Sequence, residues 1–588
     1  MNKNRTKLFF RKRIRKTKQN AEVVQEATVN TVDKHVVRRW GKLRDVRRFV
    51  IGWLALVLIL SLGVWLQGAN LKAYYSEETP AYGGTYFEGL TGKFASLNPI
   101  FAVSSADSSV AKLTFSSLLK YDNQNELVGD LATAWSVDKD EVVYTVILRD
   151  DVYWHDGEKF TADDVVFTYQ AIQQPETKSP LADSWKGIEI QAVDDYTVSF
   201  SLPNPYTPFL HSLTNGIIPR HLLSEVPYSE LRSNKFNLEP IGSGPFVFDR
   251  LIIGGEISQA ILVRNENYYA GTPYLKEFVV EAYSDHEQML NAFKKGELSA
   301  ATALRTFELE SINEMKSSNI VNFPLFNQVF IFLNNSDPLL KDSEIRRALS
   351  YATDRRAVFA ALDSNYPISD SSLIRGQLGY DDQLTQPKHD AGKANEILDK
   401  AGWKKGEDGI RTKGDQRLEI NIVSQGSDEY PIVLSEIQKS WGEVGIATTL
   451  DFIDEQDFTS NNVAPHNYQA LAFGITQGVS PDVFVYWHSS QAVKNGFNFS
   501  NYKSAKSDIA LEAGRTRSDP GLREEKYKTF LEEWINDNPA IALYRPVFNY
   551  ALRGSIKGVI PHDISTPIDR FNNVVDWSKN TELTDKEL

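Results

Sequence analysis

The feature that most constrains this chain is an uncharged apolar run near its N-terminus. The run FVIGWLALVLILSLGVWL covers Phe49–Leu66, and as a helix it would cross about 27 Å of hydrocarbon. It predicts one transmembrane helix over residues 49–67, with a basic tail before it (1–48) and a short tether after it (68–84). Arg44, Arg47 and Arg48 lie on its N-terminal side. The positive-inside rule therefore places the tail in the cytoplasm and the rest of the chain outside, in an extracellular or periplasmic space.

A cleaved signal peptide is the alternative for the same run. The residues QGANLKA follow it and offer small side chains at a cleavage point. The long tail and the length of the apolar run are unusual for a signal peptide, and they favour an anchor that is retained.

Charge is distributed very unevenly along the chain. The first 48 residues hold 16 Lys or Arg against 4 Asp or Glu, a balance of +12. Since the whole chain has a formal net charge of −13, the remaining residues carry −25. A tail of this kind suits a juxtamembrane position, and no nucleic-acid partner is expected. The acidic remainder mildly favours neutral or cationic ligands.

Cysteine is absent from the sequence. Disulfides, thiolate metal sites, iron–sulfur clusters, cysteine nucleophiles and thioether-linked lipid anchors are therefore excluded. We expect neither a cofactor nor a bound metal.

Length and hydrophobic patterning together predict a multilobed α/β protein. A chain of 588 residues exceeds the size of one hydrophobic core, so two or three lobes are expected. Residues 141–149 and 196–202 alternate as half-buried strands do. Residues 343–362 predict a helix capped by Ser343, with one apolar face. Residues 418–426 and 431–453 read as strand, helix and strand.

The stretch DVYWHDGEKFTADDVVF, Asp151–Phe167, suggests at first a catalytic or metal-binding cluster. However, Asp156 and Gly157 form a turn signal, and Thr161 can cap a helix whose first turn favours acidic residues. No second histidine lies three or four residues from His155. We therefore interpret the acids as parts of a turn and a helix start, and His155 as structural.

Several longer segments occur in an order that resembles a known family. They include WHDGEKFTADDVVFTYQAI, EPIGSGPFVFDR and IRRALSYATDRRAVFAAL. Together they resemble the extracellular solute-binding proteins that include the dipeptide- and oligopeptide-binding receptors of ABC importers. The resemblance covers about Thr85 to Trp577. The motif GSGPF lacks the lysine and the spacing of a phosphate loop, so a nucleotide site is not expected.

This resemblance implies an α/β, two-lobed periplasmic-binding-protein fold with an extra subdomain on the first lobe, preceded by one N-terminal transmembrane helix. The implied first lobe covers residues 85–325, with the subdomain inserted at about 119–215. The second lobe covers 326–545, and residues 546–588 return to the first. Asn322–Asn335 and Pro539–Leu552 are the expected crossings between the lobes, which would close around a ligand by hinge motion.

The same resemblance implies where a ligand would bind. Phe101, Ser104 and Ser105 correspond to the part of the first lobe that lines the cleft. The expected contacts of the second lobe, together with its first crossing strand, are Asn327, Thr476, Gln477, Asp482, Tyr486 and Trp487.

Peptide-binding members hold the ligand amine with an acid near the position of Gln477, and Ser480 replaces a second acid before Pro481. Asp482 is the substitute anchor, unless it caps the helical turn that follows it. Tyr486 and Trp487 would form aromatic walls of the site, or pack in the core.

The predicted function is that of a membrane-anchored substrate-binding subunit of an ABC importer, with no catalytic residues. It would act as a monomer that captures peptides and delivers them to permease and ATPase subunits. A receptor of the same fold for oligosaccharides or other small solutes, or a signalling receptor, is the alternative. A surface glycosidase is a remote one, since the sequence contains no recognisable catalytic motif.

Overall fold

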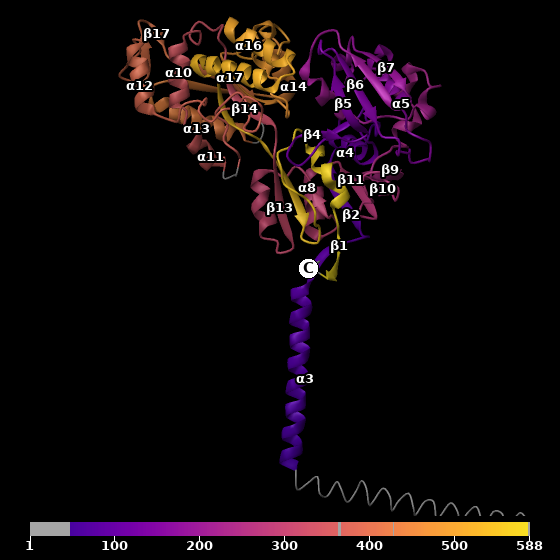
Figure 1. The fold of residues 1–588 in the computed structure, drawn as a ribbon. Coiled ribbons are helices and arrows are strands. Elements are labelled where there is room, and N and C mark those ends of the chain that lie inside the picture. Colours follow the sequence, from indigo (N-terminus) through magenta and orange to yellow (C-terminus); the bar gives the residue numbers. More distant parts are fainter. Residues whose placement is uncertain (1–46, 363–365, 427–428, 586–588) are drawn as a thin grey trace, which may run out of the picture. The chain divides into compact units, whose positions relative to one another are not determined.

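The computed structural model describes residues 47–362, 366–426 and 429–585, which divide between two units (Figure 1). The smaller unit contains helix α3 (Arg47–Tyr75). Within it, Phe49–Gln67 has the length and hydropathy of a membrane span, as predicted for residues 49–67. Strand β1 (Ser76–Ala81) follows directly and pairs with β23 (Asn580–Asp585). The segment 68–84, predicted as a tether, therefore contains the end of a helix and a strand.

The larger unit, residues 80–581, contains the two lobes. The first lobe is built on a seven-stranded sheet in which β2 is parallel to β11 and β12, while the other neighbours are antiparallel. Its strands in spatial order are β13 (Ser318–Pro324), β22 (Val547–Arg553), β12 (Ala300–Ala301), β2 (Thr85–Thr91), β11 (Glu277–Tyr283), β10 (Ile257–Arg264) and β9 (Phe246–Ile252). Its helices are α4 (Ser105–Thr114), α8 (His286–Lys295), α9 (Leu309–Asn313), and the 3₁₀ helices η6 (Thr306–Glu308) and η9 (Pro567–Asp576).

A subdomain with its own core is inserted into the first lobe. Its four-stranded sheet has the order β5 (Ala132–Val137), β6 (Val143–Leu148), β8 (Thr197–Ser201) and β7 (Glu189–Asp194), beside the hairpin of β3 (Leu119–Tyr121) and β4 (Leu127–Gly129). Helix α5 (Ala162–Gln173) packs on β7 and β8, and the rings of Tyr169 and Trp185 stack at 3.8 Å. The alternating patterns are confirmed, since β6 and β8 bury every second residue. Short helices surround this core: η2 (Pro175–Thr177), η3 (Ala182–Trp185), η4 (Thr207–Thr214), α6 (Arg220–Leu223), α7 (Tyr228–Leu231) and η5 (Lys235–Asn237). The last three lie beyond the subdomain boundary predicted near residue 215 but pack against the same core.

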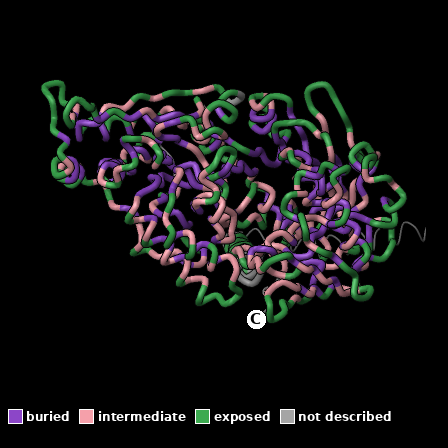
Figure 2. The backbone as a smooth tube through the Cα atoms, turned by 90° about the horizontal axis from the view of Figure 1, so that it is seen from above, coloured by how far each residue is buried: buried purple, intermediate pink, exposed green. Residues whose placement is uncertain are grey.

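The second lobe is built on a five-stranded sheet covered by helices. Its strands in spatial order are β19 (Ala447–Ile453), β18 (Glu419–Gln425), β20 (Ala470–Thr476), β14 (Asn327–Leu333) and β21 (Ala540–Tyr544). Its helices are α10 (Ser343–Ala352), α11 (Arg355–Leu362), α12 (Ala391–Lys400), α13 (Tyr430–Glu443), α14 (Glu455–Phe458), α15 (Phe484–Trp487), α16 (Ala505–Thr516), α17 (Pro520–Asp537), the π helix η7 (Thr459–Val463) and the 3₁₀ helix η8 (Ser489–Gln491). A small sheet joins β15 (Lys404–Lys405), β16 (Arg411–Lys413) and β17 (Gln416–Arg417). Figure 2 shows the buried positions gathered inside this framework.

The predicted strand, helix and strand are confirmed as β18, α13 and β19, with the two strands parallel. The helix predicted over residues 343–362 is instead two helices, α10 and α11, which are separated by Thr353 and Asp354. The predicted cap was wrong by one residue: Asp342, rather than Ser343, accepts a hydrogen bond from the backbone N–H of Glu344 at 3.0 Å. The predicted apolar face of α10 is buried.

The chain passes between the two large sheets twice. Leu325 and Phe326 connect β13 to β14, and Arg545 and Pro546 connect β21 to β22. In each sheet the two strands are close in space, since β13 pairs with β22 and β14 pairs with β21. Both connections lie inside the segments predicted as crossings.

Candidate functional site

His155 binds to the glycine turn of the first lobe. Its Nε2 lies 3.1 Å from the carbonyl oxygen of Gly244, and its Nδ1 accepts from the N–H of Gly242 at 3.3 Å. Burial lowers the pKa of His155 to about 4, so the ring is neutral near pH 7. A Cβ at Gly242 would lie 1.9 Å from the carbonyl oxygen of Thr114, which explains the glycine by close backbone contact. The segments WHDGEKFTADDVVFTYQAI and EPIGSGPFVFDR, which both carry the family resemblance, are therefore bonded to each other.

The neighbouring acids have structural partners, as predicted. Asp156 accepts from the backbone N–H of Glu158 in the turn, at 3.2 Å. Asp164 is buried and accepts from the N–H groups of Thr161 (2.9 Å) and Arg220 (2.8 Å). Burial raises the pKa of Asp164. These contacts join the start of α5 to the beginning of α6, so the acids organise the subdomain.

Arg545 links the two crossings. Its guanidinium donates to the carbonyl oxygen of Leu325, with Nε at 3.1 Å and Nη2 at 2.9 Å, and pairs with Asp563 at 2.8 Å. It also stacks over the ring of Phe326, 5.4 Å from the ring centre. The backbone N–H of Phe326 donates to Ile564 at 2.8 Å. Motion of one crossing is therefore coupled to the other.

A hollow of about 310 Å³ lies in the first lobe, at the sheet edge from which both crossings leave. This edge carries the C-terminal ends of the parallel strands β2 and β12, where α/β sheets usually place ligands. Its wall contains Ser105, Thr302, Phe548 and Arg570, with Val103 exposed beside it. The wall is mainly apolar, with several hydroxyl groups on its surface.

The three predicted contacts of the first lobe have different environments. Ser105 lines the hollow and is exposed. Ser104 is the N-cap of α4, where its hydroxyl accepts from the N–H of Asp107 at 3.0 Å. Phe101 is 2 % exposed and packs in the core of the subdomain, with Arg232 5.3 Å from its ring centre. In this conformation only Ser105 is available at the surface of the hollow.

Arg570 and Glu88 form a buried ion pair behind this hollow. Both side chains are almost fully inaccessible, and Arg570 also donates to Ser109 at 3.2 Å. The hydroxyl of Tyr550 donates to Glu88, and burial raises the pKa of both Tyr550 and Tyr86. The two charges neutralise each other, and the ion pair holds Arg570 in the wall of the hollow.

The second lobe contributes the end of β20 and the loop after it. Asn327 pairs with Thr476 in the β14–β20 ladder. Gln477 follows, and its backbone N–H donates to Phe326 at the crossing, at 2.9 Å. Its side-chain amide donates to the carbonyl oxygen of Ser372 at 2.9 Å, while the side-chain oxygens of Asn327 and Gln477 have no hydrogen-bond partner among the described residues. The structure therefore brings Asn327, Thr476 and Gln477 together beside the hinge.

Asp482 already has a cationic partner. Its carboxylate pairs with Arg515 at 2.9 Å and accepts from the hydroxyl of Tyr206, in the subdomain, at 3.5 Å. Arg515 stacks on Tyr206 and Phe484, with ring-centre distances of 5.0 and 4.2 Å. These residues belong to different lobes, so Asp482 is part of an interlobe contact. The predicted capping contact, from the N–H of Phe484, is long at 3.4 Å.

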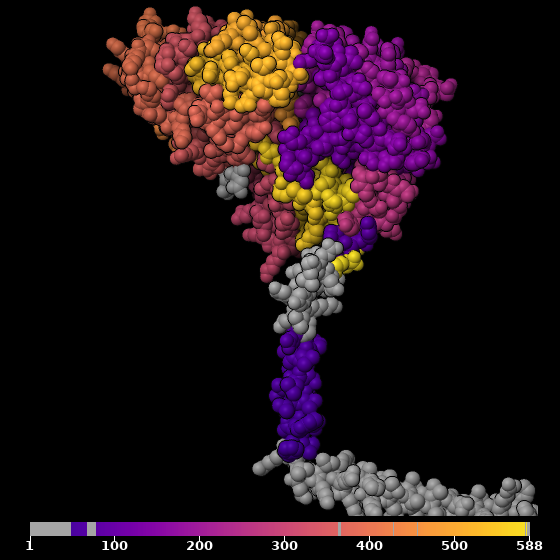
Figure 3. All heavy atoms as spheres, in the orientation of Figure 1, coloured from indigo at the N-terminus to yellow at the C-terminus, as the bar shows by residue number. Residues whose placement is uncertain are grey.

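Two further contacts lie beside Asp482. The hydroxyl of Thr207 donates to the carbonyl oxygen of Arg517 at 2.8 Å, and Ser518 donates to Glu141 from its N–H (2.9 Å) and its hydroxyl (2.6 Å). Figure 3 shows the subdomain and the region of α16 in direct contact. We name the set of Asp482, Arg515, Tyr206, Thr207 and Ser518 the lobe clasp.

The two predicted aromatic walls differ in exposure. Tyr486 is half-buried and donates from its hydroxyl to the carbonyl oxygen of Thr476 at 2.5 Å, which ties the loop to β20. Burial raises the pKa of Tyr486 to about 12. Trp487 is fully buried against Phe330, Phe332 and Trp534. A side chain without exposed surface contacts no ligand in this conformation, so Trp487 belongs to the core here.

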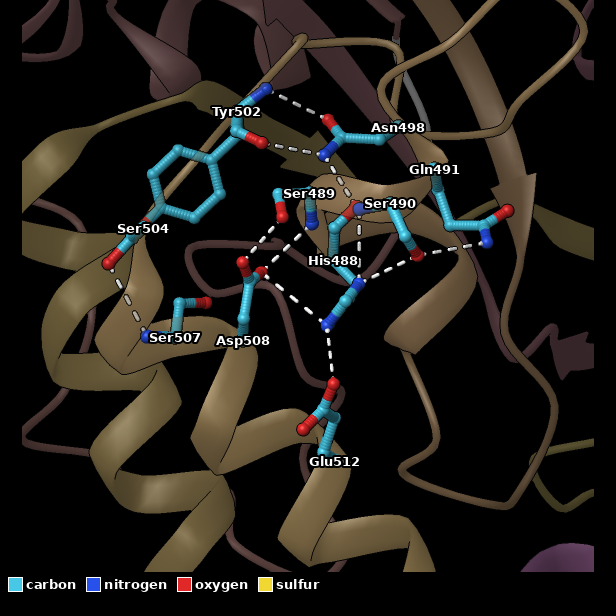
Figure 4. Close-up of polar contacts among 10 residues, drawn as sticks. All are labelled: His488, Ser489, Ser490, Gln491, Asn498, Tyr502, Ser504, Ser507, Asp508 and Glu512. Carbon is cyan, nitrogen blue, oxygen red and sulfur yellow. Dashed lines mark hydrogen bonds and ion pairs between the residues drawn. The ribbon is translucent and has the colours of Figure 1, made fainter.

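A polar cluster fixes the C-terminal end of this loop (Figure 4). The Nδ1 of His488 accepts from the N–H of Ser490 at 3.1 Å, and its Nε2 faces Glu512 at 3.3 Å and Asp508 at 3.8 Å. Asp508 also accepts from the N–H and hydroxyl of Ser489. His488 is therefore an N-cap of η8 bound to α16, and its ring stacks on Phe484 of the loop.

A carboxylate that the sequence did not single out lies near the second crossing. Glu429 accepts from the hydroxyls of Tyr544 (2.8 Å) and Tyr366 (3.1 Å). Tyr366 also contacts the hydroxyl of Thr306, in the first lobe, at 3.1 Å. Burial raises the pKa of Tyr544. Within the described residues, no Lys, Arg or His lies within 4.0 Å of the Glu429 carboxylate, which is half-buried.

Metal ligation has no cluster to support it in the part of the chain that the structure describes. There, no group of three or more His, Cys, Asp or Glu side chains is arranged to hold an ion. What the described residues offer is a binding surface with hydroxyls, backbone groups, aromatic rings and the Glu429 carboxylate, which has no Lys, Arg or His within 4.0 Å among them.

Comparison with known proteins places this arrangement in context. Residues 126–497 match the sequence model described as bacterial extracellular solute-binding proteins, family 5 middle. The oligopeptide-binding protein AppA of Bacillus subtilis is 27 % identical over 540 residues, which cover 89 % of this chain and 97 % of AppA. The solved structure of AppA in complex with a nonapeptide is 25 % identical, has a TM-score of 0.65, and covers 85 % of this chain and 99 % of that one.

A second similar structure contains a different ligand. NikZ of Campylobacter jejuni in complex with Ni(L-His) is 27 % identical, with a TM-score of 0.67, and covers 84 % of this chain and 99 % of that one. The two-lobed fold is therefore common to proteins whose ligands differ in chemistry.

Proposed function

Since the chain belongs to the family of bacterial extracellular solute-binding proteins, family 5, we propose that it captures peptides between its two lobes and delivers them to the permease of an ABC importer. The observation that carries the proposal is the similarity to AppA over nearly the full length of both proteins. Transport energy would come from ATPase subunits. The chain would bind and release its ligand as a monomer, without chemical change.

We propose that the ligand lies along the hollow of the first lobe and the end of β20. Ser105 would contact it from the first lobe, held by the Ser104 cap of α4, and Asn327, Thr476, Gln477 and Tyr486 would contact it from the other side. Main-chain hydrogen bonds to an extended peptide accommodate varied side chains, which suits a site with few charged groups. Phe101 and Trp487 would support the site from the core.

Glu429 is the residue that we propose for the ligand amine. A half-buried carboxylate without a cation is stabilised when an ammonium group binds to it. Asp482 already has Arg515, so a ligand ammonium would have to compete with a guanidinium that is held by two aromatic rings. In this arrangement Asp482 would stabilise the contact between the lobes, through its bonds to Arg515 and Tyr206 in the lobe clasp.

The hinge is proposed to consist of Leu325, Phe326, Arg545 and Pro546. The first lobe would comprise residues 85–325 and 546–588, with the subdomain at about 119–215, and the second lobe residues 326–545. Because Arg545 bonds to both crossings, they would rotate together when the lobes close. Helix α3 would keep the protein at the membrane, with the N-terminus in the cytoplasm and the lobes outside.

Ligand class can be tested with the full-length protein in lipid nanodiscs. Pools of di- to hexapeptides, and separately oligosaccharides, are added while the unfolding temperature is measured. A ligand at about one hundred times its dissociation constant stabilises a protein by about 2.7 kcal/mol. We expect stabilisation by peptides. Stabilisation by oligosaccharides without any effect of peptides would overturn the proposed ligand class.

A further inference from the structure

The strand register defines one edge of the first-lobe sheet, opposite to the crossings. It contains the start of β2, at Thr85, and the start of β11, at Glu277, which are paired. It also contains the start of β13 and the end of β22, since Ser318 pairs with Arg553. Figure 1 shows β2, β13 and α8 in the same part of the lobe. Helix α8 ends at this edge, where Arg553 donates to the carbonyl oxygen of Lys294.

Basic side chains gather at this edge, although the chain after residue 48 is strongly acidic. We name the following set the basic edge: Lys276, Lys294, Lys295, Lys316, Arg553, Lys557 and Lys579. Five of them are exposed lysines. Within the described residues, none of the seven has a carboxylate partner within 4.0 Å. These cations are therefore not held in salt bridges within the described residues.

A hollow of about 550 Å³ lies within the basic edge. Its lining includes two basic side chains, Arg553 and Lys579, one acidic side chain, Glu297, and Ser555. Arg553 is held in place, since it donates to Ser317 at 3.0 Å and stacks on Phe293 at the end of α8. Lys579 donates to the carbonyl oxygen of Thr85 at 2.8 Å. Both cations are therefore positioned around a concave surface large enough for an anionic group.

Acidic side chains are present as well. Glu277 accepts from the hydroxyl of Thr85 at 2.7 Å, and Glu266 pairs with Arg264 at 2.6 Å. On the larger unit's segments of this edge, the exposed acids are Glu297, Glu314 and Asp576, so the seven basic side chains outnumber the five acids named here. The dipole of α8 favours Lys294 and Lys295 at its C-terminal end, but it does not explain Lys276, Lys316 and Lys557 on three other segments.

Chain connectivity relates this edge to the membrane. Gln67 ends the apolar part of α3, and Thr85 begins β2. The eight helical residues after Gln67 and the nine residues that follow them reach at most roughly 45 Å. The other connection to the smaller unit, between Thr581 and Glu582, lies two residues after Lys579. Of the two edges of the sheet, the basic edge is thus the one to which the anchor is attached.

We propose that the basic edge binds the headgroups of anionic phospholipids in the membrane that holds α3, which orients the first lobe. The proposal rests on the proposed membrane anchorage and is independent of the ligand in the cleft. Each lysine near an anionic bilayer contributes about 1 kcal/mol, and the attraction falls within about 8 Å, so it acts only when the edge lies against the lipid surface. The opposite edge of the sheet, which carries the hollow of about 310 Å³, would then face away from the bilayer.

The test uses energy transfer in nanodiscs that hold the full-length protein. Because the chain has no cysteine, Ser555→Cys provides a single labelling position in the basic edge, and Ser184→Cys provides one in the subdomain. Acceptor-labelled lipid is included in bilayers of phosphatidylcholine alone or with one third phosphatidylglycerol. We expect transfer from position 555 to rise with phosphatidylglycerol and to fall at high salt, while transfer from position 184 shows no such rise.

Charge reversal distinguishes a local effect from an effect of net charge. Lys294→Glu, Lys295→Glu and Lys316→Glu together are compared with a matched control, Lys139→Glu, Lys186→Glu and Lys494→Glu, which are exposed lysines elsewhere. Each lysine lost from the edge is expected to lower the ratio of docked to undocked protein by about fivefold. The control should retain the lipid dependence.

Three results would overturn the proposal: equal transfer in both bilayers, unchanged transfer in the edge variant, or equal loss in the control. Failure of the protein to remain in the nanodiscs would overturn it too, by removing the anchor. Stabilisation by peptides is measured in the same samples. If peptides have no effect while the lipid dependence persists, the proposed ligand is wrong and the lipid contact stands. The reverse result rejects only the lipid contact.

Discussion

The two carboxylates near the cleft, Glu429 and Asp482, are expected to affect ligand binding in different ways. Glu429→Gln removes the negative charge and keeps an oxygen that can accept from Tyr544. A hydrogen bond to a charged group contributes about 1.5–3 kcal/mol, so the variant should bind peptides with a free amine roughly 10- to 150-fold more weakly. Peptides whose amine is acetylated have no ammonium group, so their affinity should not change.

Asp482→Asn should change the affinity for peptides in a different way. It leaves Arg515 without its counter-ion and weakens the contact with Tyr206, which reaches across from the subdomain. Arg515 is partly exposed, so the pair contributes only about 1 kcal/mol to closure. We therefore expect about a fivefold loss of affinity, equal for free and acetylated peptides.

Isothermal titration calorimetry of both variants with matched pairs of free and acetylated peptides provides the measurement. Thr516→Ala, on the same helix as Arg515, is a control that should bind like the wild type. The reasoning is refuted if Asp482→Asn weakens only the free-amine peptides, because that result assigns the anchor to Asp482. It is also refuted if Glu429→Gln leaves the free-amine peptides unaffected.

Three further predictions concern stability, measured by urea unfolding. Arg570→Met should lower the free energy of unfolding by about 3–5 kcal/mol because Glu88 is left buried without a partner, and adding Glu88→Gln should restore part of it; no restoration would contradict the pairing. The pKa of His155 lies below its usual value, so protonation favours the unfolded chain. The stability that it contributes should therefore be complete well above pH 6.5 and fall by roughly 3 kcal/mol by pH 4, and a His155→Gln variant with an unchanged pH slope would refute this. Gly242→Ala should destabilise by more than about 2 kcal/mol because its methyl group would overlap the Thr114 backbone, whereas Gly255→Ala, in open space, should have little effect.

The elements of the fold were predictable because their signals are local. Val198 and Phe200 alternate with half-buried residues in β8, and the apolar face of α10 repeats at helical spacing. The break at Thr353 was not predicted, although part of its signal is local, since Asp354 accepts from the N–H groups of Arg356 and Ala357 at the start of α11. The hydroxyl of Thr353 donates to Leu349 and accepts from the indole N–H of Trp441, 88 residues away. Sequence periodicity continues through such a position, while the tertiary contact ends the helix there.

The candidate site was less predictable because its chemistry depends on which charges meet. Asp482 was identified from its place in a loop, but its cationic partner lies 33 residues away and its tyrosine partner 276 residues away. Nothing in the residues around Glu429 distinguishes it from other surface acids, because its environment comes from Tyr544, 115 residues later. A carboxylate's role is set by the nearest cation and by its burial. For that reason, an acid that already has its cation is expected to hold the lobes together, and an acid without one is expected to select the ligand.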